Sequence, residues 1–415
     1  MSYILIIEPS SSGTNYLQAC IDLGLNPIIM TAGSDDRKIN NYILILAKDV
    51  IYCDTNNIEL CIKKLTSYPL LHEINVIIPG FEYYIPLTAK INEFFKLKGM
   101  PIEVALNVRE KNRMRKKVSD AGIKSPSFRI VNEINYQLVL SEDFEFPVVV
   151  KPTAWSGSIM VRKAQNKEEL KEALHEVCEC NFSEYGMNSC RTAIIEEYIQ
   201  GREFSVEGFA IKNEIFIISI TEKYLGKEPY FVEIGHISPA QIDANTKNSI
   251  EKYTKSIINA LNINGSPFHC ELRLSDDGPV LIEIGARLAG DHICDLIFNS
   301  QRINMYRAGI ACYLDNMDLF KNELSNKNII GYSGIRYFIR HGISSYSKIQ
   351  LGKKIEAWDG LLEYKIQIME NQKIPPANNS LGRLGYVIFF NKNYTLLKDE
   401  LECFDSNIHF LTSQS

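Results

Sequence analysis

The segment 269–287, HCELRLSDDGPVLIEIGAR, has two glutamates and two arginines in a pattern that predicts a β-hairpin. The Asp-Asp-Gly sequence at 276–278 supplies turn residues, and strand-forming residues flank it on both sides. With the loop at 276–278, Glu271 lies opposite Glu283, and alternate side chains point to the same face of the hairpin. The residues expected on this face are Glu271, Arg273, Glu283, Gly285 and Arg287.

Two opposed glutamates indicate a site for a cation. Their Cβ atoms would lie about 4.5–5.5 Å apart, where like charges repel unless something neutralises them. Mg²⁺ prefers one or two protein carboxylates together with phosphate oxygens and water, so the pair suggests a nucleotide phosphate site. The alternative is a surface hairpin whose glutamates are solvated or paired with Arg273 and Arg287. The hairpin alone does not decide between the two.

The composition is typical of a soluble, multidomain globular protein. Hydrophobic residues make up 45% of the 415 residues and charged residues 23%, and this length suggests two to four domains at roughly 150 residues per domain. The net charge of -5 disfavours a general nucleic-acid-binding protein. The one basic run, REKNRMRKK at 109–117, is better explained as the solvated face of a helix.

The first residues resemble a buried strand rather than a signal peptide, and no window has the roughly 18–20 apolar residues needed to cross a bilayer. We therefore expect a cytoplasmic protein. The ten cysteines include no CxxC pair, which disfavours a zinc site, and reduced thiols are the expected state.

The N-terminal part alternates strand and helix patterns, which predicts an open parallel sheet. The expected elements are a strand at 3–9, a helix at 16–25, a strand at 26–31, a strand at 74–80 and a helix beginning near 84–86. The serine-rich turn at 10–13 could cradle a phosphate at a helix N-terminus, but it lacks the GxGxxG spacing and a structural turn is favoured.

A charged helix is expected from Arg109 to Gly122, followed by strands at 146–152 and 159–164. The loop between these strands contains Ser156, Gly157 and Ser158. Its backbone amides could converge on phosphate oxygens beside the charge of Lys151, although small residues also form ordinary hairpin turns.

The remaining pattern predicts an α+β fold packed against the first domain. It gives a helix at 167–177, a strand at 193–201 and a strand pair at 203–211 and 214–220. Two strand-like segments follow in the last hundred residues, at 331–339 and 381–390.

These elements, in this order, resemble the ATP-grasp superfamily of carboxylate-amine ligases, and within it the branch of amino-acid ligases that make dipeptides. The similarity rests on several ordered motifs across nearly the whole chain. It implies a combined α/β and α+β architecture in three domains. These are an N-terminal pre-ATP-grasp domain at 1–108, an ATP-grasp nucleotide-binding domain at 109–310 and a C-terminal substrate-covering domain at 311–415.

The resemblance assigns nucleotide-binding roles along the segments 109–126, 146–158 and 194–208. It implies phosphate contacts by two lysines and a covering loop, backbone contacts to adenine, and a glutamate on the ribose. The implied residues are, in that order, Lys111 and Lys151, the loop residues Ser156, Gly157 and Ser158, then Glu197 and Ile199, and finally Glu203.

The same resemblance makes Glu271 and Glu283 the metal ligands and Arg287 the arginine that steadies the transferred phosphate or the acyl-phosphate. It also places His236, in the segment 231–240, on the acceptor side facing the substrate, where a structural histidine is an equal alternative. The family usually reads E-x-N-x-R at the metal strand, whereas this chain has Gly285 in place of the asparagine. A second metal ion is then either held by Glu283 alone or bound more weakly.

The implied reaction is the ATP-dependent joining of a carboxylate and an amine through an acyl-phosphate, with ADP and phosphate released. The implied cofactors are ATP and Mg²⁺, with Mn²⁺ as an alternative metal. The expected partners are small-molecule substrates, an amino acid and an amine or second amino acid, with no nucleic acid or membrane. The oligomeric state is left open, with a homodimer as the commonest symmetric choice. The competing interpretations are a biotin-carboxylase-like enzyme and a non-catalytic nucleotide-binding protein. The first is disfavoured because Arg287 is followed by Leu-Ala-Gly-Asp-His and no biotin-carrier motif is present.

Overall fold

The computed structural model describes residues 2–132, 134–180, 183–188 and 191–412. Its N-terminal part is a four-stranded parallel sheet, as the sequence predicts. The strands are β1 (Tyr3–Ile7), β2 (Asn26–Thr31), β3 (Asp49–Tyr52) and β4 (Ile74–Pro79). They lie in the order β3-β2-β1-β4, and every residue of β1 is buried, because helices cover both faces of such a sheet.

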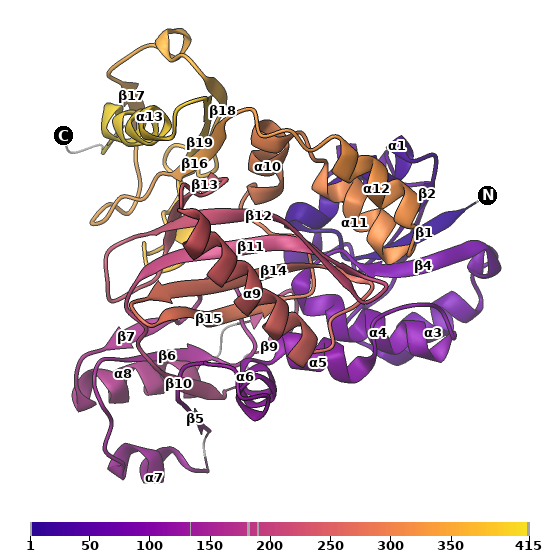
Figure 1. Cartoon of the computed structure of the whole chain (residues 1–415), viewed down its shortest axis with the longest axis horizontal. Coiled ribbons are helices and arrows are strands. Elements are labelled where there is room, and N and C mark those ends of the chain that lie inside the picture. Colours follow the sequence, from indigo (N-terminus) through magenta and orange to yellow (C-terminus); the bar gives the residue numbers. More distant parts are fainter. Residues whose placement is uncertain (1, 133, 181–182, 189–190, 413–415) are drawn as a thin grey trace.

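Short helices connect and cover this sheet, at one side of the molecule (Figure 1). They are η1 (Ser11–Thr14), α1 (Asn15–Asp22), η2 (Asp35–Arg37), α2 (Asn41–Leu44), α3 (Ile58–Thr66), η3 (Leu71–Glu73), η4 (Glu82–Tyr84), α4 (Ile85–Phe94) and α5 (Ile102–Arg109). The loop before α1 packs tightly on the end of β4, since a Cβ on Gly13 would lie 1.7 Å from the carbonyl oxygen of Gly80.

A second, smaller sheet has the order β5-β10-β6-β7 and packs against α8 through a core of its own. Its elements are β5 (Phe128–Val131), α7 (Tyr136–Ser141), β6 (Val148–Pro152), β7 (Arg162–Ala164), α8 (Lys167–Cys178) and β10 (Ala193–Glu197). A two-stranded hairpin, β8 (Ser183–Glu184) and β9 (Met187–Asn188), lies between α8 and β10 in the sequence.

The largest sheet is eight-stranded and antiparallel, in the order β15-β14-β11-β12-β13-β16-β19-β18. Its strands are β11 (Arg202–Ile211), β12 (Glu214–Leu225), β13 (Glu233–Ser238), β14 (Ser266–Ser275), β15 (Gly278–Gly285), β16 (Tyr332–Tyr337), β18 (Leu361–Ile366) and β19 (Gly385–Asn391). Because β13 pairs with β16, this sheet continues across residue 310. The division into segments 1–108, 109–310 and 311–415 stays a prediction.

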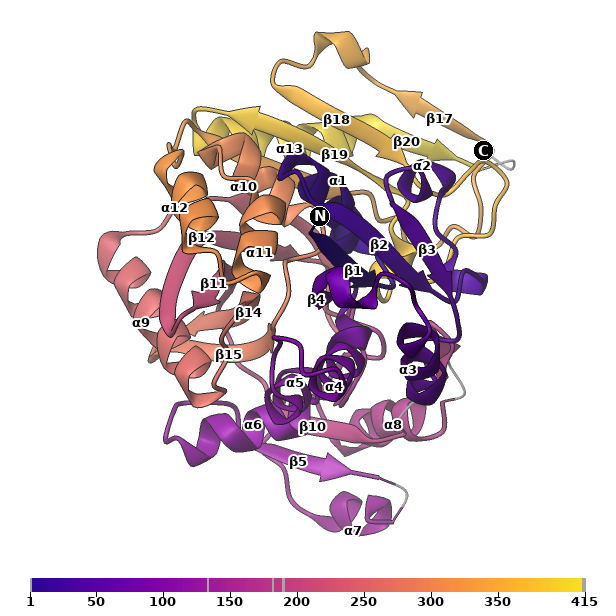
Figure 2. The same cartoon turned by 90° about the vertical axis from the view of Figure 1, so that its right-hand side faces the viewer.

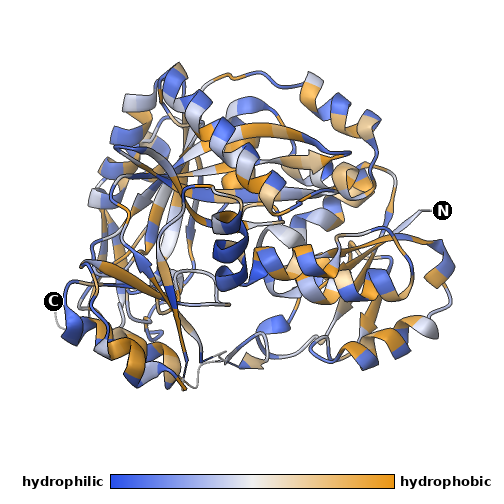
Figure 3. Ribbon diagram, turned by 60° about the horizontal axis from the view of Figure 1, so that its bottom comes forward, coloured by the Kyte–Doolittle hydropathy of each residue, from blue (hydrophilic) through white to orange (hydrophobic). Residues whose placement is uncertain are grey.

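Helices of the second half pack on the large sheet or extend from it, and α9 lies across one face of it (Figures 1 and 2). The remaining elements are α6 (Lys111–Asp120), α9 (Ala244–Ala260), α10 (Ile293–Gln301), α11 (Met305–Tyr313), α12 (Met317–Ser325), β17 (Lys348–Leu351), η5 (Ile355–Ala357), η6 (Ser380–Gly382), α13 (Tyr394–Asn407) and β20 (Ile408–Leu411). Hydrophobic residues run along the strands, whereas the surface helices alternate between hydrophobic and hydrophilic turns (Figure 3). None of the described helices combines the length and apolar composition required to cross a bilayer.

The hairpin of β14 and β15 corrects one expectation and confirms another. Ser275 pairs with Gly278, so the loop consists of two residues and the prediction of a three-residue loop at 276–278 is wrong. A β-bulge next to Glu271 then shifts the register by one residue. Glu271 consequently does face Glu283, as predicted.

The helix expected from Arg109 to Gly122 is α6, which begins at Lys111 because Arg109 is the last residue of α5. Glu110 adopts an extended conformation, with φ -101° and ψ 113°, and separates α5 from α6. Lys111 is therefore the first residue of α6, and its backbone amide donates to the carbonyl of Thr153, 3.0 Å away, beside the end of β6. This break places the Lys111 side chain next to the loop that follows β6.

Candidate active site

A cavity of about 300 Å³ lies where the N-terminal sheet, the small sheet and the large sheet meet. Residues from all three sheets line it, together with Ser380 from the C-terminal part. The structure brings together at this cavity every predicted site residue except His236. The predicted residues that line it are Lys111, Lys151, Ser156, Gly157, Ser158, Glu197, Ile199, Glu203, Glu271, Glu283 and Arg287.

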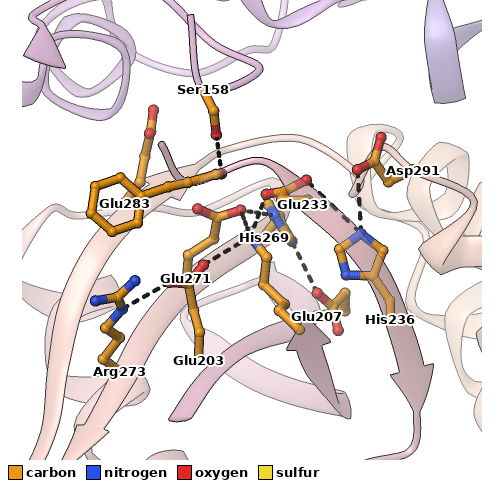
Figure 4. Close-up of polar contacts among 12 residues, drawn as sticks. Ser158, Glu203, Glu207, Glu233, His236, His269, Glu271, Arg273, Glu283 and Asp291 are labelled. Carbon is orange, nitrogen blue, oxygen red and sulfur yellow. Dashed lines mark hydrogen bonds and ion pairs between the residues drawn. The ribbon is translucent and has the colours of Figure 1, made fainter. Parts of the chain in front are cut away.

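Glu271 and Glu283 lie opposite each other and have separate cationic partners. The Glu271 carboxylate accepts from His269 Nε2 at 3.0 Å (Figure 4) and also contacts the Lys223 ammonium. Glu283 accepts from Lys111 Nζ at 2.9 Å. Burial would raise the pKa of Glu271, but Lys223 and His269 hold it well below the usual value. Glu271 is thus kept ionised, which is the form a divalent cation requires.

His269 lies behind Glu271 and steadies it. Its Nδ1 contacts Glu207 at 2.9 Å, and Glu207 accepts in turn from the Thr221 hydroxyl at 2.9 Å. Although burial lowers the pKa of His269, the two glutamates raise it to about 9. The imidazolium therefore bridges two carboxylates and fixes the orientation of Glu271.

Gly285 occupies the position where a metal-binding asparagine was expected from the family pattern. A Cβ at this position would lie 3.3 Å from Cγ of Arg287, because the arginine side chain extends across the glycine. A larger residue at 285 would therefore crowd Arg287. The two carboxylates fit one divalent cation, and position 285 supplies no further side-chain oxygen.

Arg287 is oriented by the N-terminal part of the chain. Its Nε and Nη2 donate to Glu82 Oε2 at 2.8 and 2.6 Å. Glu82 follows the end of β4 and also lies 3.7 Å from Arg109 Nη1. Burial would raise the pKa of Glu82, but Arg287, Arg109 and Lys111 lower it to about 2. A permanently ionised carboxylate thus holds the guanidinium at the cavity.

Lys151 belongs to a fully buried ion-pair network beneath the cavity. Glu196 accepts from Lys151 Nζ at 2.6 Å and from Arg115 Nε at 2.7 Å. The carbonyl of Ile282, the extra residue of the β-bulge, also accepts from Arg115 Nη2 at 2.6 Å. Burial would raise the pKa of Glu196, whereas Arg115 and Lys151 lower it to about 2. This network fixes the small sheet against the hairpin of β14 and β15.

Arg115→Met is expected to destabilise the protein by about 3 kcal/mol, because breaking a buried ion pair leaves a charge poorly compensated. Chemical denaturation of the two proteins would measure the change in free energy of unfolding. The matched control is Arg113→Met on the same helix, whose side chain is 46% exposed and pairs with Glu110. It should cost no more than about 0.5 kcal/mol, and equal effects of the two substitutions would contradict the expectation.

The loop at 156–158 is anchored to three parts of the chain. The Ser156 hydroxyl lies 3.1 Å from the Tyr83 hydroxyl, and the Ser158 hydroxyl donates to the carbonyl of Phe231 at 2.9 Å. The carbonyl of Gly157 accepts from the Ser380 hydroxyl at 3.1 Å. The loop therefore lies over the cavity, in contact with both the N-terminal and the C-terminal parts.

Glu203 and Ile199 both contact Arg273, which lies on β14 two residues after Glu271. Arg273 Nε donates to Glu203 at 2.9 Å and its Nη1 donates to the carbonyl of Ile199 at 2.8 Å. Glu203 also lies 3.5 Å from Lys223 Nζ. Glu197 is exposed, and its backbone amide donates to Ser127.

His236 differs from the expectation that it faces the substrate. Its side chain is fully buried and does not line the cavity. It lies 3.2 Å from Asp291 Oδ2 and 3.9 Å from Glu233 Oε2, and these two carboxylates do line the cavity (Figure 4). We therefore regard His236 as a residue that positions Glu233 and Asp291.

Arg383, from the C-terminal part, forms a bidentate contact with Asp291 at 2.8 Å for each oxygen. Its Nε donates to the carbonyl of Glu233 at 3.0 Å and its Nη2 lies 3.3 Å from the Glu233 carboxylate. The buried guanidinium thus lies behind two carboxylates that line the cavity and holds them in place.

Sequence reasoning missed several charged residues of the cavity, namely Glu82, Glu184, Lys223, Glu233, His269 and Asp291. One of them had a usable signal. Glu82 follows the carboxyl end of a parallel strand, where open α/β sheets bind their ligands. Lys223 faces Glu203 across two antiparallel strands, and nothing in the local sequence marks that pairing.

A model of the ATP-grasp domain family matches residues 144–295. An uncharacterized protein of Sinorhizobium fredii is 26% identical over 288 residues, which cover 69% of this chain and 58% of that protein. Alanine–anticapsin ligase of Bacillus subtilis is 27% identical over 251 residues, which cover 56% of this chain and 52% of that ligase. The chain thus spans about half to three-fifths of the length of these curated relatives.

The crystal structure of an L-amino acid ligase from Bacillus licheniformis superposes with a TM-score of 0.83 at 22% identity, covering 100% of this chain and 99% of that one. The two main expectations from the sequence, an ATP-grasp fold and relatives among the amino-acid ligases, are confirmed. Residues 144–295 therefore match the ATP-grasp domain family, the whole chain shares its fold with an L-amino acid ligase, and its sequence is similar to that of an alanine–anticapsin ligase.

Proposed function

We propose that the protein is an ATP-dependent ligase that joins the carboxylate of an amino acid to an amine, through an acyl-phosphate, with release of ADP and phosphate. The observation that carries the proposal is the meeting of Arg287, Lys111 and the opposed pair Glu271 and Glu283 at one cavity. Phosphoryl transfer needs this kind of positioning and charge neutralisation and no covalent nucleophile from the protein.

ATP enters this cavity with its phosphates toward Lys111 and Lys151 and beneath the loop at 156–158. At the other end, the Ile199 carbonyl is already taken by Arg273, so the backbone amide of Ile199 is the group that remains to contact the base. The carboxylate of Glu203 has the acceptor capacity to bind ribose hydroxyls.

Glu271 and Glu283 would hold Mg²⁺, and they fit it because two opposed carboxylates are the donor set this ion prefers. When bound, the ion supplies charge neutralisation for the phosphate oxygens. Lys223 and Lys111 already contact these two carboxylates, so the glutamates keep positive neighbours whether or not a metal is present.

In the first step, a carboxylate oxygen of the amino acid attacks the γ-phosphorus of ATP, and the bond from that phosphorus to ADP breaks. Arg287 stabilises the charge on the transferred phosphoryl group. In the second step, the amine nitrogen attacks the acyl carbon, the bond to phosphate breaks and the amine loses a proton. The loop at 156–158 excludes water, since an acyl-phosphate would otherwise hydrolyse.

The test is release of ADP and phosphate by the purified protein with ATP and Mg²⁺, screened against single amino acids and their pairs, with mass spectrometry of the products. We expect ADP release that depends on particular amino acids and yields a condensed product. Turnover with bicarbonate alone would favour the carboxylase alternative. The similarity to amino-acid ligases disfavours that alternative. ATP binding without amino-acid-dependent turnover would contradict the proposal.

Mn²⁺ as an alternative metal, a homodimeric assembly and a cytoplasmic location remain predictions from the sequence. Gly285 favours a single strongly held metal ion, because it offers no side-chain oxygen to a second one.

A further inference from the structure

The hairpin of β8 and β9 reaches from the small sheet to the N-terminal sheet. Its central residue, Tyr185, stacks on Phe81 with ring centroids 4.4 Å apart and meets Tyr83 edge-on at 5.7 Å. The Tyr185 hydroxyl lies 2.5 Å from the Ser10 hydroxyl, and its carbonyl accepts from Asn56 at 2.9 Å. An aromatic and polar socket on the N-terminal part therefore fixes this hairpin.

This docking places Glu184, the residue before Tyr185, at the wall of the cavity. The Glu184 carboxylate accepts from the Tyr83 hydroxyl at 2.5 Å. The Tyr83 hydroxyl also lies 3.1 Å from the Ser156 hydroxyl, in the loop over the phosphate position. Glu184 is thus connected through the Tyr83 hydroxyl to the loop that lies over the cavity.

Glu184 also differs from the other acids of the cavity in its charge balance. Seven carboxylates that line the cavity form ion pairs within the described chain, namely those of Glu82, Glu196, Glu203, Glu233, Glu271, Glu283 and Asp291. Among the described residues, Glu184 and the exposed Glu197 line the cavity without such a pair. Burial raises the pKa of Glu184, which means that its negative charge is incompletely compensated.

We propose that Glu184 binds a positively charged nitrogen of the substrate, and that the Tyr185 socket holds it in place to do so. The inference rests on the proposed ligase function and names the chemistry of one substrate. A cationic nitrogen has two sources in an amino acid, the α-ammonium group and a basic side chain. Either would form a charge-assisted hydrogen bond with the free oxygen of Glu184.

The test compares Glu184→Gln with the unchanged protein in the ADP-release assay. The substrates are arginine with its uncharged analogue citrulline, lysine with norleucine, and alanine. Loss of a charge-assisted hydrogen bond is expected to raise the KM for the amino acid by about 10- to 100-fold and to leave the KM for ATP unchanged. An increase confined to arginine and lysine identifies the side-chain cation, and an equal increase for all amino acids identifies the α-ammonium group.

Tyr185→Ala should raise the same KM as Glu184→Gln, because it releases the socket while leaving the carboxylate in the chain. The matched control is Glu176→Gln, an exposed glutamate on α8 of the same small sheet unit, which should leave every KM unchanged. Thermal unfolding of each variant checks that the fold is kept. An unchanged amino-acid KM in Glu184→Gln would overturn the inference while leaving the ligase intact. Absence of amino-acid-dependent turnover in the unchanged protein would instead overturn the proposed function.

Discussion

Arg287→Ala is expected to lower kcat/KM for amino-acid-dependent ADP release by about 10³-fold, the range found when an arginine that stabilises a transferred phosphoryl group is removed. The reason is geometric. Glu82 holds the Arg287 guanidinium at the cavity. The Arg287 side chain lies against Gly285 at the end of β15, because a Cβ on this glycine would touch it. The KM for ATP should change little, because the adenine and ribose contacts lie elsewhere.

Arg287→Lys sharpens this test. It keeps the positive charge beside Glu82 but loses the forked N–H geometry, so its activity should lie between those of the alanine variant and the unchanged protein. Because Arg287→Ala also leaves the buried Glu82 with fewer partners, thermal unfolding must show that the assay temperature lies below the transition. Arg129→Ala, an exposed arginine that pairs with Glu142, serves as the control. A loss of less than tenfold in Arg287→Ala would place the transferred phosphate away from this side chain.

The sequence predicted the metal-strand hairpin well because its information is local. Turn residues and alternation define which strand positions face each other over a few residues. The exact turn was still wrong, because the loop has two residues instead of three, and a bulge next to Glu271 then moved the register by one. Two compensating irregularities therefore left the functionally important pair, Glu271 and Glu283, where the simple pattern placed it.

Glu82 shows why much of the cavity could not be predicted. Its partner Arg287 is 205 residues away in the chain and lies on a different sheet. Such a contact depends on how three sheets pack together, and hydrophobic periodicity carries no information about that packing. Lys223 and Asp291 are similar cases, because their partners come from strands and loops that meet only in the folded protein.

The strand order of the large sheet was also beyond local reasoning. The strands β16 and β19 were recognised as strands, but not as neighbours of β13 within one continuous sheet. The family resemblance supplied what periodicity could not, namely the roles of Lys111, Lys151 and the loop at 156–158. The resemblance did not predict that His236 is buried. This burial depends on the packing of Asp291 and Arg383 in this chain.

Glu283→Gln is expected to reduce kcat by about 10²- to 10³-fold and to raise the Mg²⁺ concentration needed for half-maximal activity, because it removes a ligand of the metal. Each tenfold loss corresponds to about 1.4 kcal/mol of transition-state stabilisation. Glutamine keeps the shape of the side chain but removes the charge that a hard cation needs. Of the two acids, Glu283 gives the cleaner test. Among the described residues it forms an ion pair with Lys111, whereas Glu271 contacts both Lys223 and His269.

The matched control is Asp277→Asn at the tip of the same hairpin, where the side chain is 90% exposed and only 3.6 Å from Lys124. It removes one negative charge from the same hairpin, but at its exposed tip. We therefore expect kcat and the Mg²⁺ requirement to stay unchanged. Calorimetric titration of Mg²⁺ with ADP adds a readout that does not depend on turnover, and Glu283→Gln should weaken this binding. Full activity at unchanged Mg²⁺ in Glu283→Gln would mean that Glu283 serves only to neutralise Lys111. The opposed pair would then be a structural ion-pair cluster, which was the alternative left open by the hairpin sequence.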